Sequence, residues 1–300
     1  MIRIVTDSTA SIPRNLVEEN DIEVATMFLH YNDVEYEDAT MDVDAFYEDI
    51  YDMIDNIPTS SQPSQAQLED IFERAAEAGD DAIGVFMSSD MSGTVSGALR
   101  AARSVAARHA DFKFRIIDAM SNSMDEGWAV LAAAAGRSAG CTLDQCCKLA
   151  TDAVPRSRFL FTPESLRFLK AGGRIGASAA LLGTLMKLCP ILTVVDGETS
   201  TFAKVRTHKK ALAAIAAQFE KDVRECGLKN AIVHYIGSSE EAKRWARDVI
   251  EPICGRLVTV APVSPCIGLH VGPAVAVTYE CVRVLPGKLT PGTQVPVYAS

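Results

Sequence analysis

The stretch Ala82-Ile83-Gly84-Val85-Phe86-Met87, followed by Ser88-Ser89-Asp90-Met91-Ser92-Gly93-Thr94, decides the fold class. Its first six residues form an apolar run with the length of a buried strand, and the polar run after them suits a turn that opens a helix. The same order of strand, turn and helix recurs after residues 2–5, 114–117 and 159–161. Strands that alternate with helices predict a parallel sheet covered by helices, which is the α/β class.

The second half of the chain has a different pattern. Strands are expected at residues 191–195, 231–236, 257–260 and 274–279, and only two long helical patterns, near 207–225 and 239–253, separate them. This pattern predicts an α+β domain with a mixed sheet. We therefore expect an N-terminal parallel-sheet α/β domain, residues 1–160, and a C-terminal α+β domain, residues 161–300. The boundary is placed to within about fifteen residues, because it rests on the change of pattern alone.

Composition and charge restrict the function. The 300 residues include 29 Lys and Arg against 39 Asp and Glu, and the resulting net charge of −10 repels nucleic-acid phosphates and anionic membranes. The longest apolar run, residues 128–135, is much shorter than the roughly 18 residues that suggest a membrane span. The N-terminus lacks the pattern of a secretory signal. We expect a cytoplasmic protein that is not membrane-embedded and does not bind nucleic acid.

Common enzyme signatures are absent from the sequence. No segment matches the phosphate-binding loop, the dinucleotide-binding glycine pattern or the nucleophile elbow of hydrolases. The eight cysteines form no Cys-x-x-Cys pair, and the five histidines lack the spacing of metal ligands. We interpret the cysteines as reduced core residues. The sequence therefore predicts no metal site, no cofactor and no catalytic residues.

Three hydroxyl-rich segments lie at the ends of expected strands or just before expected helices, where open α/β sheets bind ligands. They are Thr6-Asp7-Ser8-Thr9, Thr59-Ser60-Ser61-Gln62-Pro63-Ser64, and residues 88–94. The third is expected to open a helix near Ser92, whose free backbone N–H groups would favour a carboxylate or phosphate. The alternative is that these residues are helix caps and turn formers, and for Asp7 we favour that interpretation.

Two further features lie in the second half. The run Lys204-Val205-Arg206-Thr207-His208-Lys209-Lys210 gathers basic residues at a strand-to-helix junction, although such runs usually form a solvated face. His270 lies between Gly268 and Gly272, which allow a close backbone approach. A lone histidine is more often structural than functional, so neither feature identifies a site without support from elsewhere.

In their order along the chain, these segments resemble the DegV family of bacterial fatty-acid-binding proteins. The resemblance spans nearly the whole chain and also draws on Leu169-Lys170-Ala171-Gly172-Gly173-Arg174-Ile175 and on Asp196-Gly197. It implies a long-chain fatty acid as ligand, with its tail in a buried apolar tunnel and its carboxylate near the domain junction. It also implies a partner, a separate fatty acid kinase that makes acyl phosphate from the acid that this chain carries. The chain itself would not be an enzyme.

Carried over by motif, the resemblance implies that Ser60 and Ser92 hydrogen-bond the carboxylate and that Arg206 and His270 lie close to it. Ser60 stands where the family usually has threonine, so the hydroxyl is retained. Asp90 replaces a usual glycine, and we expect it to point to solvent because a buried anion there would oppose binding.

Two other segments bear on the resemblance. Residues 118–124 depart from the Asp-Ser-Lys-Ser pattern that is typical of the family at this place and lack its lysine. Leu181, Leu182, Leu185 and Met186 suit a tail tunnel and an ordinary core equally well.

Burying about fifteen methylenes at about 0.8 kcal/mol each would give on the order of 12 kcal/mol before the entropy of binding is subtracted. We therefore expect the tail to supply affinity and the carboxylate contacts to supply orientation.

Two other functions fit the residues. The first is a stand-alone phosphoryl- or acyl-transfer enzyme in which Asp7, Ser92 and His270 converge, since distant residues can assemble such a site. The second is a regulatory protein for which the lipid is a signal and whose acidic surface binds another macromolecule. Turnover of generic phosphate or ester substrates by the purified protein would favour the first, and a stable partner other than a kinase would favour the second.

Overall fold

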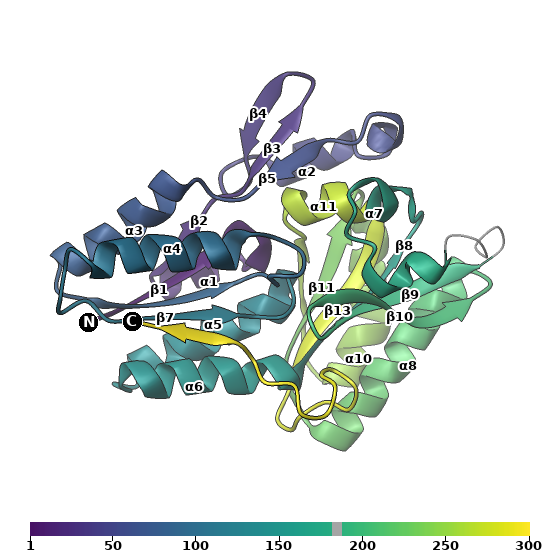
Figure 1. The fold of residues 1–300 in the computed structure, drawn as a ribbon. Coiled ribbons are helices and arrows are strands. Elements are labelled where there is room, and N and C mark those ends of the chain that lie inside the picture. The colour runs from purple at the N-terminus through teal and green to yellow at the C-terminus, as the bar shows by residue number, and fades with distance from the viewer. Residues whose placement is uncertain (182–187) are drawn as a thin grey trace.

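The chain forms three β-sheets flanked by helices in a computed structural model that describes residues 1–181 and 188–300 (Figure 1). The larger two sheets have the strand orders β14-β7-β6-β1-β2 and β10-β9-β8-β13-β11-β12, and the small one has the order β4-β3-β5. The predicted fold class is confirmed, because a parallel α/β sheet is followed by an α+β region with a mixed sheet.

The first sheet is parallel except at one edge. Its parallel strands are β1 (Ile2–Asp7), β2 (Ile22–Ala25), β6 (Asp81–Phe86) and β7 (Phe114–Asp118). β14 (Val297–Ala299) returns from the other end of the sequence and pairs antiparallel with β7. The C-terminal residues thus contribute to the N-terminal sheet.

Helices cover both faces of this sheet (Figure 1). They are α3 (Gln65–Glu77) and α4 (Thr94–Ala106) on one face, and α5 (Ser123–Ser138) and α6 (Leu143–Ala153) on the other. Successive residues of β1 alternate between the faces, because Ile4 belongs to the cluster with α5 and α6 whereas Val5 belongs to the cluster with α3 and α4. Burial on both faces explains why these strands are continuous apolar runs.

The second sheet is mixed. Its strands are β8 (Ser157–Pro163), β9 (Cys189–Val195), β10 (Glu198–Val205), β11 (Leu228–Ile236), β12 (Thr259–Pro262) and β13 (Ala274–Cys281). Its pairs are antiparallel except β11 with β12. The expectation that residues 159–161 continue the first, parallel sheet was wrong, because β8 lies inside the second sheet between β9 and β13. The boundary near residue 160 stays a prediction.

The remaining helices are shorter, apart from α8. They are α1 (Arg14–Glu19), α2 (Val43–Glu48), α7 (Arg167–Ala171), α8 (His208–Cys226), α9 (Ser239–Trp245), α10 (Glu251–Cys254) and α11 (Pro265–Val271), with the 3-10 helices η1 (Ser8–Ala10), η2 (Asp52–Asp55), η3 (Val154–Arg156) and η4 (Gly176–Leu181) and the π-helix η6 (Ala246–Ile250). α8 lies against β8, β9 and β13, and α5 of the N-terminal region also contacts β8 and β13. The two regions therefore share an interface built around α5.

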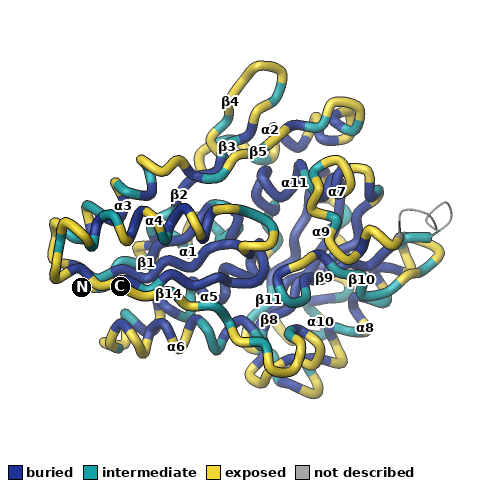
Figure 2. Tube along the Cα trace, in the orientation of Figure 1, coloured by how far each residue is buried: buried dark blue, intermediate teal, exposed yellow. Residues whose placement is uncertain are grey.

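The small antiparallel sheet joins the two regions. It consists of β3 (Phe28–Tyr31), β4 (Val34–Glu37) and β5 (Thr59–Ser61). Tyr47 of α2 donates to the Val263 carbonyl at 2.8 Å, and Tyr235 of β11 donates to Asp44 Oδ1 at 2.7 Å. The hairpin of β3 and β4 is largely exposed (Figure 2). These contacts fasten an N-terminal segment onto the C-terminal region and bring β5 close to α11.

Hydroxyl side chains cap α3, α6 and α9. Ser64, Thr142 and Ser238 each accept a hydrogen bond from a first-turn backbone N–H. At Thr142 the reciprocal bond from the Thr142 N–H to Gln145 completes the capping box. At Ser238 the donor is Glu240 N, at 3.3 Å.

Other expectations concern absences. No helix in residues 1–181 and 188–300 is long and apolar enough to cross a membrane. Within the same ranges, no group of three or more His, Cys, Asp and Glu could hold a metal ion. All eight cysteines are in the described part of the chain, and none of them forms a disulfide there.

Candidate functional site

A cavity of about 310 Å³ lies where the first sheet, the small sheet and the second sheet meet. This volume is at the lower end of the range for ligand pockets, roughly 300–1,000 Å³. Its wall consists of Met27, Ser60, Ser61, Gln62, Met87, Met91, Ser92, Gly93, Asn122, Phe159, Phe161, Leu169, Arg174, Val194, Thr199, Cys266, Ile267, His270 and Val271. Polar groups from loops and apolar groups from strands thus face one space.

Ser60 and His270 form the centre of the polar part. Ser60 Oγ on β5 lies 2.9 Å from His270 Nε2 on α11, although 210 positions separate them in sequence. Burial, aided by the charge of Arg174, lowers the pKa of His270 to about 4. The imidazole is therefore neutral near pH 7 and shares one proton with the serine hydroxyl through this hydrogen bond.

The position of His270 depends on Gly172. His270 Nδ1 is buried without a hydrogen-bond partner among the described residues. A Cβ added at Gly172, just after α7, would lie 2.1 Å from that Nδ1. The glycine is required here for close approach, since its backbone angles are in the ordinary helical region. The Gly172 in the family-like block and the distant His270 thus fit against each other.

Ser92 contributes the second hydroxyl. α4 begins at Thr94, two residues later than expected, and Ser92 Oγ accepts from Thr94 N at 3.3 Å. Ser92 Oγ also lies 2.8 Å from Thr94 Oγ1. The hydroxyl lines the cavity and retains a lone pair or proton for a ligand. Ser92 therefore serves both as a turn former, which was the alternative interpretation, and as part of the cavity wall.

Among the described residues, the basic residue that lines the cavity is Arg174, not Arg206. Arg206 is exposed at the end of β10 and is not among the described residues that line the cavity. Arg174 Nη1 donates to the Gly172 carbonyl at 2.6 Å, and its Nε donates to the Met91 carbonyl at 3.3 Å. These bonds hold the guanidinium across the cavity between α7 and the loop after β6. Of the four site residues predicted from the sequence, the structure brings together Ser60, Ser92 and His270.

Asp7 is committed elsewhere. Its Oδ1 accepts from the backbone and side chain of Thr9, and its Oδ2 accepts from Met87 N at 3.0 Å. It caps η1, in agreement with the interpretation of Asp7 as a helix cap. Burial raises the pKa of Asp7 to about 6 against these hydrogen bonds. No hydrogen bond in the described chain joins Asp7 to Ser92 or His270, so a converged triad is not observed.

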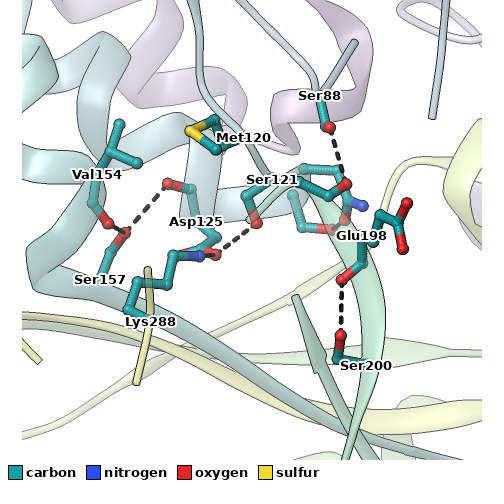
Figure 3. A network of polar contacts seen from close by, with 12 residues as sticks. Ser88, Met120, Ser121, Asp125, Val154, Ser157, Glu198, Ser200 and Lys288 are labelled. Carbon is teal, nitrogen blue, oxygen red and sulfur yellow. Dashed lines mark hydrogen bonds and ion pairs between the residues drawn. The ribbon is translucent and has the colours of Figure 1, made fainter. Parts of the chain in front are cut away.

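Polar contacts outside the cavity tie its two sides together (Figure 3). Ser88 Oγ, after β6, donates to the Gly197 carbonyl in the turn between β9 and β10 at 2.8 Å. Gly197 has a φ of 89°, and a Cβ there would lie 2.7 Å from Ser88 Oγ. The turn therefore requires glycine at this position for two reasons, the backbone angle and the close approach of Ser88. On α5, the buried Asp125 pairs with Lys288 and accepts from Ser121 at 2.5 Å. The bonds of Ser88 to Gly197 and of Asp125 to Lys288 thus join the two regions.

The departures from the family pattern have clear positions. Asp90 is exposed, as expected. In the segment 118–124, Asp118 accepts from Met120 N at 2.7 Å and from Ser89 N at 3.2 Å. Asn122 lines the cavity and its Nδ2 lies 3.1 Å from Met91 Sδ. This segment therefore shapes the cavity without a lysine.

Several cavity residues were not predicted. Arg174 and Gln62 lie in blocks that supported the family resemblance, so their motifs were a usable signal. The apolar members Met87, Phe159 and Phe161 lie in strands or at their ends and look like ordinary core residues. Leu182, Leu185 and Met186 lie outside the described residues, and so does the side chain of Leu181.

Three comparisons identify relatives. The family model described as "Uncharacterised protein, DegV family" matches residues 1–281. A DegV domain-containing protein of Clostridium acetobutylicum is 37% identical over 284 residues, which cover 93% of this chain and 97% of that protein. The solved structure of DegV from Bacillus subtilis, described as a fatty acid binding protein, is 26% identical with a TM-score of 0.83, over 93% of this chain and 99% of that chain.

A second solved structure, described by the fatty acid binding of a DegV family protein from Thermus thermophilus, is also 26% identical. Its TM-score is 0.81, and the match covers 93% of this chain and 99% of that chain. Family model, relative and structures agree with the resemblance seen in the sequence. The chain belongs to the DegV family.

Proposed function

We propose that this protein binds a long-chain fatty acid in the cavity and presents its carboxylate to a separate fatty acid kinase for acyl phosphate formation. The observation that carries the proposal is a single cavity with two kinds of lining. Ser60, Ser92 and His270 form a cluster of polar residues, called the polar group below, and β8, β9 and α11 supply an apolar wall. The relatives from Bacillus subtilis and Thermus thermophilus, described by fatty acid binding, support the ligand class.

The polar group suits a carboxylate. Ser60 and Ser92 supply hydroxyl donors, and a hydrogen bond to a charged group contributes about 1.5–3 kcal/mol. Arg174 adds a positive charge from the cavity wall. A neutral, buried histidine bonded to Ser60 fixes the hydroxyl without adding a second charge. Together these contacts offset the cost of removing the carboxylate from water and orient it.

The apolar wall suits an alkyl chain. Phe159, Phe161, Leu169, Val194, Ile267 and Val271 line the space that continues from the polar group. Each methylene buried there contributes about 0.8 kcal/mol, so chain length dominates affinity. The protein therefore acts as a carrier in this proposal, not as a catalyst, and works in the cytoplasm without cofactor or metal.

Arg206 has a different part in the proposal. It is exposed at the junction of β10 and α8, in the basic run 204–210. Arg206 does not line the cavity in the described chain, so it is not placed to hold the head group, but it can offset negative charge as the kinase transfers phosphate. Arg206→Ala is expected to leave fatty acid affinity unchanged and to lower acyl phosphate formation by about tenfold, the loss of one charge-assisted contact.

The test compares two serines of one loop. Ser92→Ala is expected to weaken fatty acid binding by about tenfold, since it removes a hydrogen bond to a charged group. Ser89→Ala is the matched control, because Ser89 is exposed and does not line the cavity in the described chain. Affinities follow from displacement of a fluorescent fatty acid, and phosphorylation of bound acid is measured with kinase and ATP. Normal binding and normal phosphorylation with Ser92→Ala would contradict the assigned role.

A further inference from the structure

The cavity has two walls of different stiffness. The methionine wall consists of Met27 before β3, Met87 after β6 and Met91 in the loop before α4. The phenylalanine wall consists of Phe159 and Phe161, two residues apart on β8. Three of the nine methionines in the chain thus line a single cavity. The walls come from different regions, so a ligand between them contacts both.

Met27 and Met87 are buried in the hydrophobic core, and the polar contacts of the methionine wall are weak. Asn122 Nδ2 donates to Met91 Sδ at 3.1 Å, and Thr94 Oγ1 approaches Met27 Sδ at 3.9 Å. Thioether sulfur is a weak acceptor, so these bonds set a resting position that is easily exchanged for another. An unbranched side chain with three rotatable bonds adapts its shape to a neighbour at small cost.

The phenylalanine wall is rigid by comparison. The two rings are stacked with centroids 4.8 Å apart and planes inclined by 23°. Their strand, β8, pairs with β13 and β9 on either side. The rings are about as buried as Met27 and Met87, so the two walls differ in side-chain flexibility and not in burial. A ring has two rotatable side-chain bonds, and close packing on its strand restricts both. A ligand therefore has to conform to this wall.

We propose that Met27, Met87 and Met91 set the tail selectivity of the cavity by adapting to the ligand, so that straight saturated and bent cis-monounsaturated chains bind with similar affinity. This inference rests on the proposed fatty acid binding and adds the determinant of its specificity. A rigid pocket discriminates between chains that differ by one methylene by roughly 10–200-fold. A wall that changes shape removes most of that discrimination, because each chain induces its own fit.

Thr94 connects this wall with the polar group. Its hydroxyl approaches Met27 Sδ and lies 2.8 Å from Ser92 Oγ. The contact with Ser92 is a hydrogen bond at the start of α4, whereas the contact with Met27 is a weak thioether contact that the methionine can give up without moving Ser92. Tail shape and carboxylate position are thus separable, which a carrier of several acids requires.

The experiment replaces the methionines by leucine. Met27→Leu, Met87→Leu and Met91→Leu combined preserve volume but branch at Cγ and lose a rotatable bond. The control is Met53→Leu with Met124→Leu, two buried methionines outside the cavity wall. Affinities for stearate and oleate, which share chain length but differ by one cis double bond, are measured by displacement of a fluorescent fatty acid. The readout is the ratio of the two dissociation constants.

The wild-type and control ratios are expected within about threefold of one, and the triple variant is expected to change the ratio by at least about tenfold. A wild-type ratio above about tenfold, or an unchanged ratio in the triple variant, overturns the inference while leaving fatty acid binding intact. Failure of the wild type to bind either acid overturns the proposed function itself.

Should the triple variant not fold, Met91→Leu alone carries the test, because Met91 is only partly buried. A shift of about threefold supports the inference and an unchanged ratio overturns it.

Discussion

The loop after β1 and the loop after β6 have the same kind of sequence and neighbouring positions in one sheet. Both are rich in hydroxyl groups, and both lie at the carboxyl ends of adjacent parallel strands, where α/β sheets bind ligands. Their surroundings differ. The first loop is packed under α5 and borders a separate hollow that α1 and β12 also line, whereas the second opens onto the cavity between the two regions.

In the first loop, partners inside the fold use up the polar groups. Thr6 Oγ1 donates to Glu126 Oε1 at 3.0 Å, Ser8 Oγ accepts from Met27 N at 3.0 Å, and Asp7 binds Thr9 and Met87. In the second loop, Met91, Ser92 and Gly93 line the cavity. A hydroxyl-rich sequence after a strand therefore indicates where donors lie, and the packing of distant elements decides whether they remain available.

The largest effect is expected from breaking the first loop. Asp7→Ala leaves the Thr9 and Met87 N–H groups buried without acceptors, at about 1–3 kcal/mol each. At pH 5 the carboxyl is mostly protonated, since its pKa is raised to about 6, so relief of a buried charge does not offset this loss. We expect the free energy of unfolding, measured with urea at pH 5, to fall by about 2–4 kcal/mol.

Asp90→Ala is the matched control in the second loop. Asp90 is exposed, so its loss is expected to change the free energy of unfolding by less than about 0.5 kcal/mol. Equal destabilisation by the two variants would contradict the distinction between the loops.

The next effect concerns the fit of Gly172 against His270. Gly172→Ala places a Cβ 2.1 Å from His270 Nδ1, so the imidazole has to move away from Ser60. Fatty acid affinity is expected to fall by at least about tenfold, because the polar group loses its geometry. Ala171→Ser, at an exposed neighbouring position, is the control and should leave affinity unchanged. Displacement of a fluorescent fatty acid measures both, and equal affinities would show that His270 does not orient the site.

Replacing Ser60 is expected to have a smaller effect on fatty acid binding, and a threonine at this position is expected to avoid it. Ser60→Ala removes one donor and is expected to weaken fatty acid binding by about tenfold, while Ser60→Thr keeps the hydroxyl and should bind like the wild type. Isothermal titration with oleate distinguishes them. A threonine variant as weak as the alanine variant would mean that packing, and not the hydroxyl, governs this position.

The smallest effect is a shift of protonation. His270 has its pKa lowered to about 4 by burial, and the charge of a bound carboxylate favours the imidazolium, so binding should raise this pKa by about one unit. Linkage then requires that affinity for the carboxylate rises as pH falls from about 6 toward 4. Histidine ring NMR measures the midpoint. His234, whose pKa burial also lowers to about 4, is outside the cavity wall and should not respond. Equal shifts of both histidines would point to a global change.

The main elements of the fold could be predicted because their strands are apolar runs and their helices have capping residues. The small sheet and β14 could not, because β4 is largely polar, β5 and β14 have three residues each, and all depend on distant partners. The same reason applies to the site. Motifs pointed to Ser60, Ser92 and His270, which line the cavity. Arg174 and Arg206 are both exposed, and only the arrangement of α7 against the loop after β6 places Arg174 in the cavity wall.

The most direct test of the central claim is native mass spectrometry of the purified protein, with and without added oleate, followed by organic extraction and identification of any bound molecule. We predict one fatty acid per chain, either copurified or taken up on addition, because the cavity joins carboxylate donors to an apolar wall. A protein that is empty and takes up no added fatty acid would contradict the proposal.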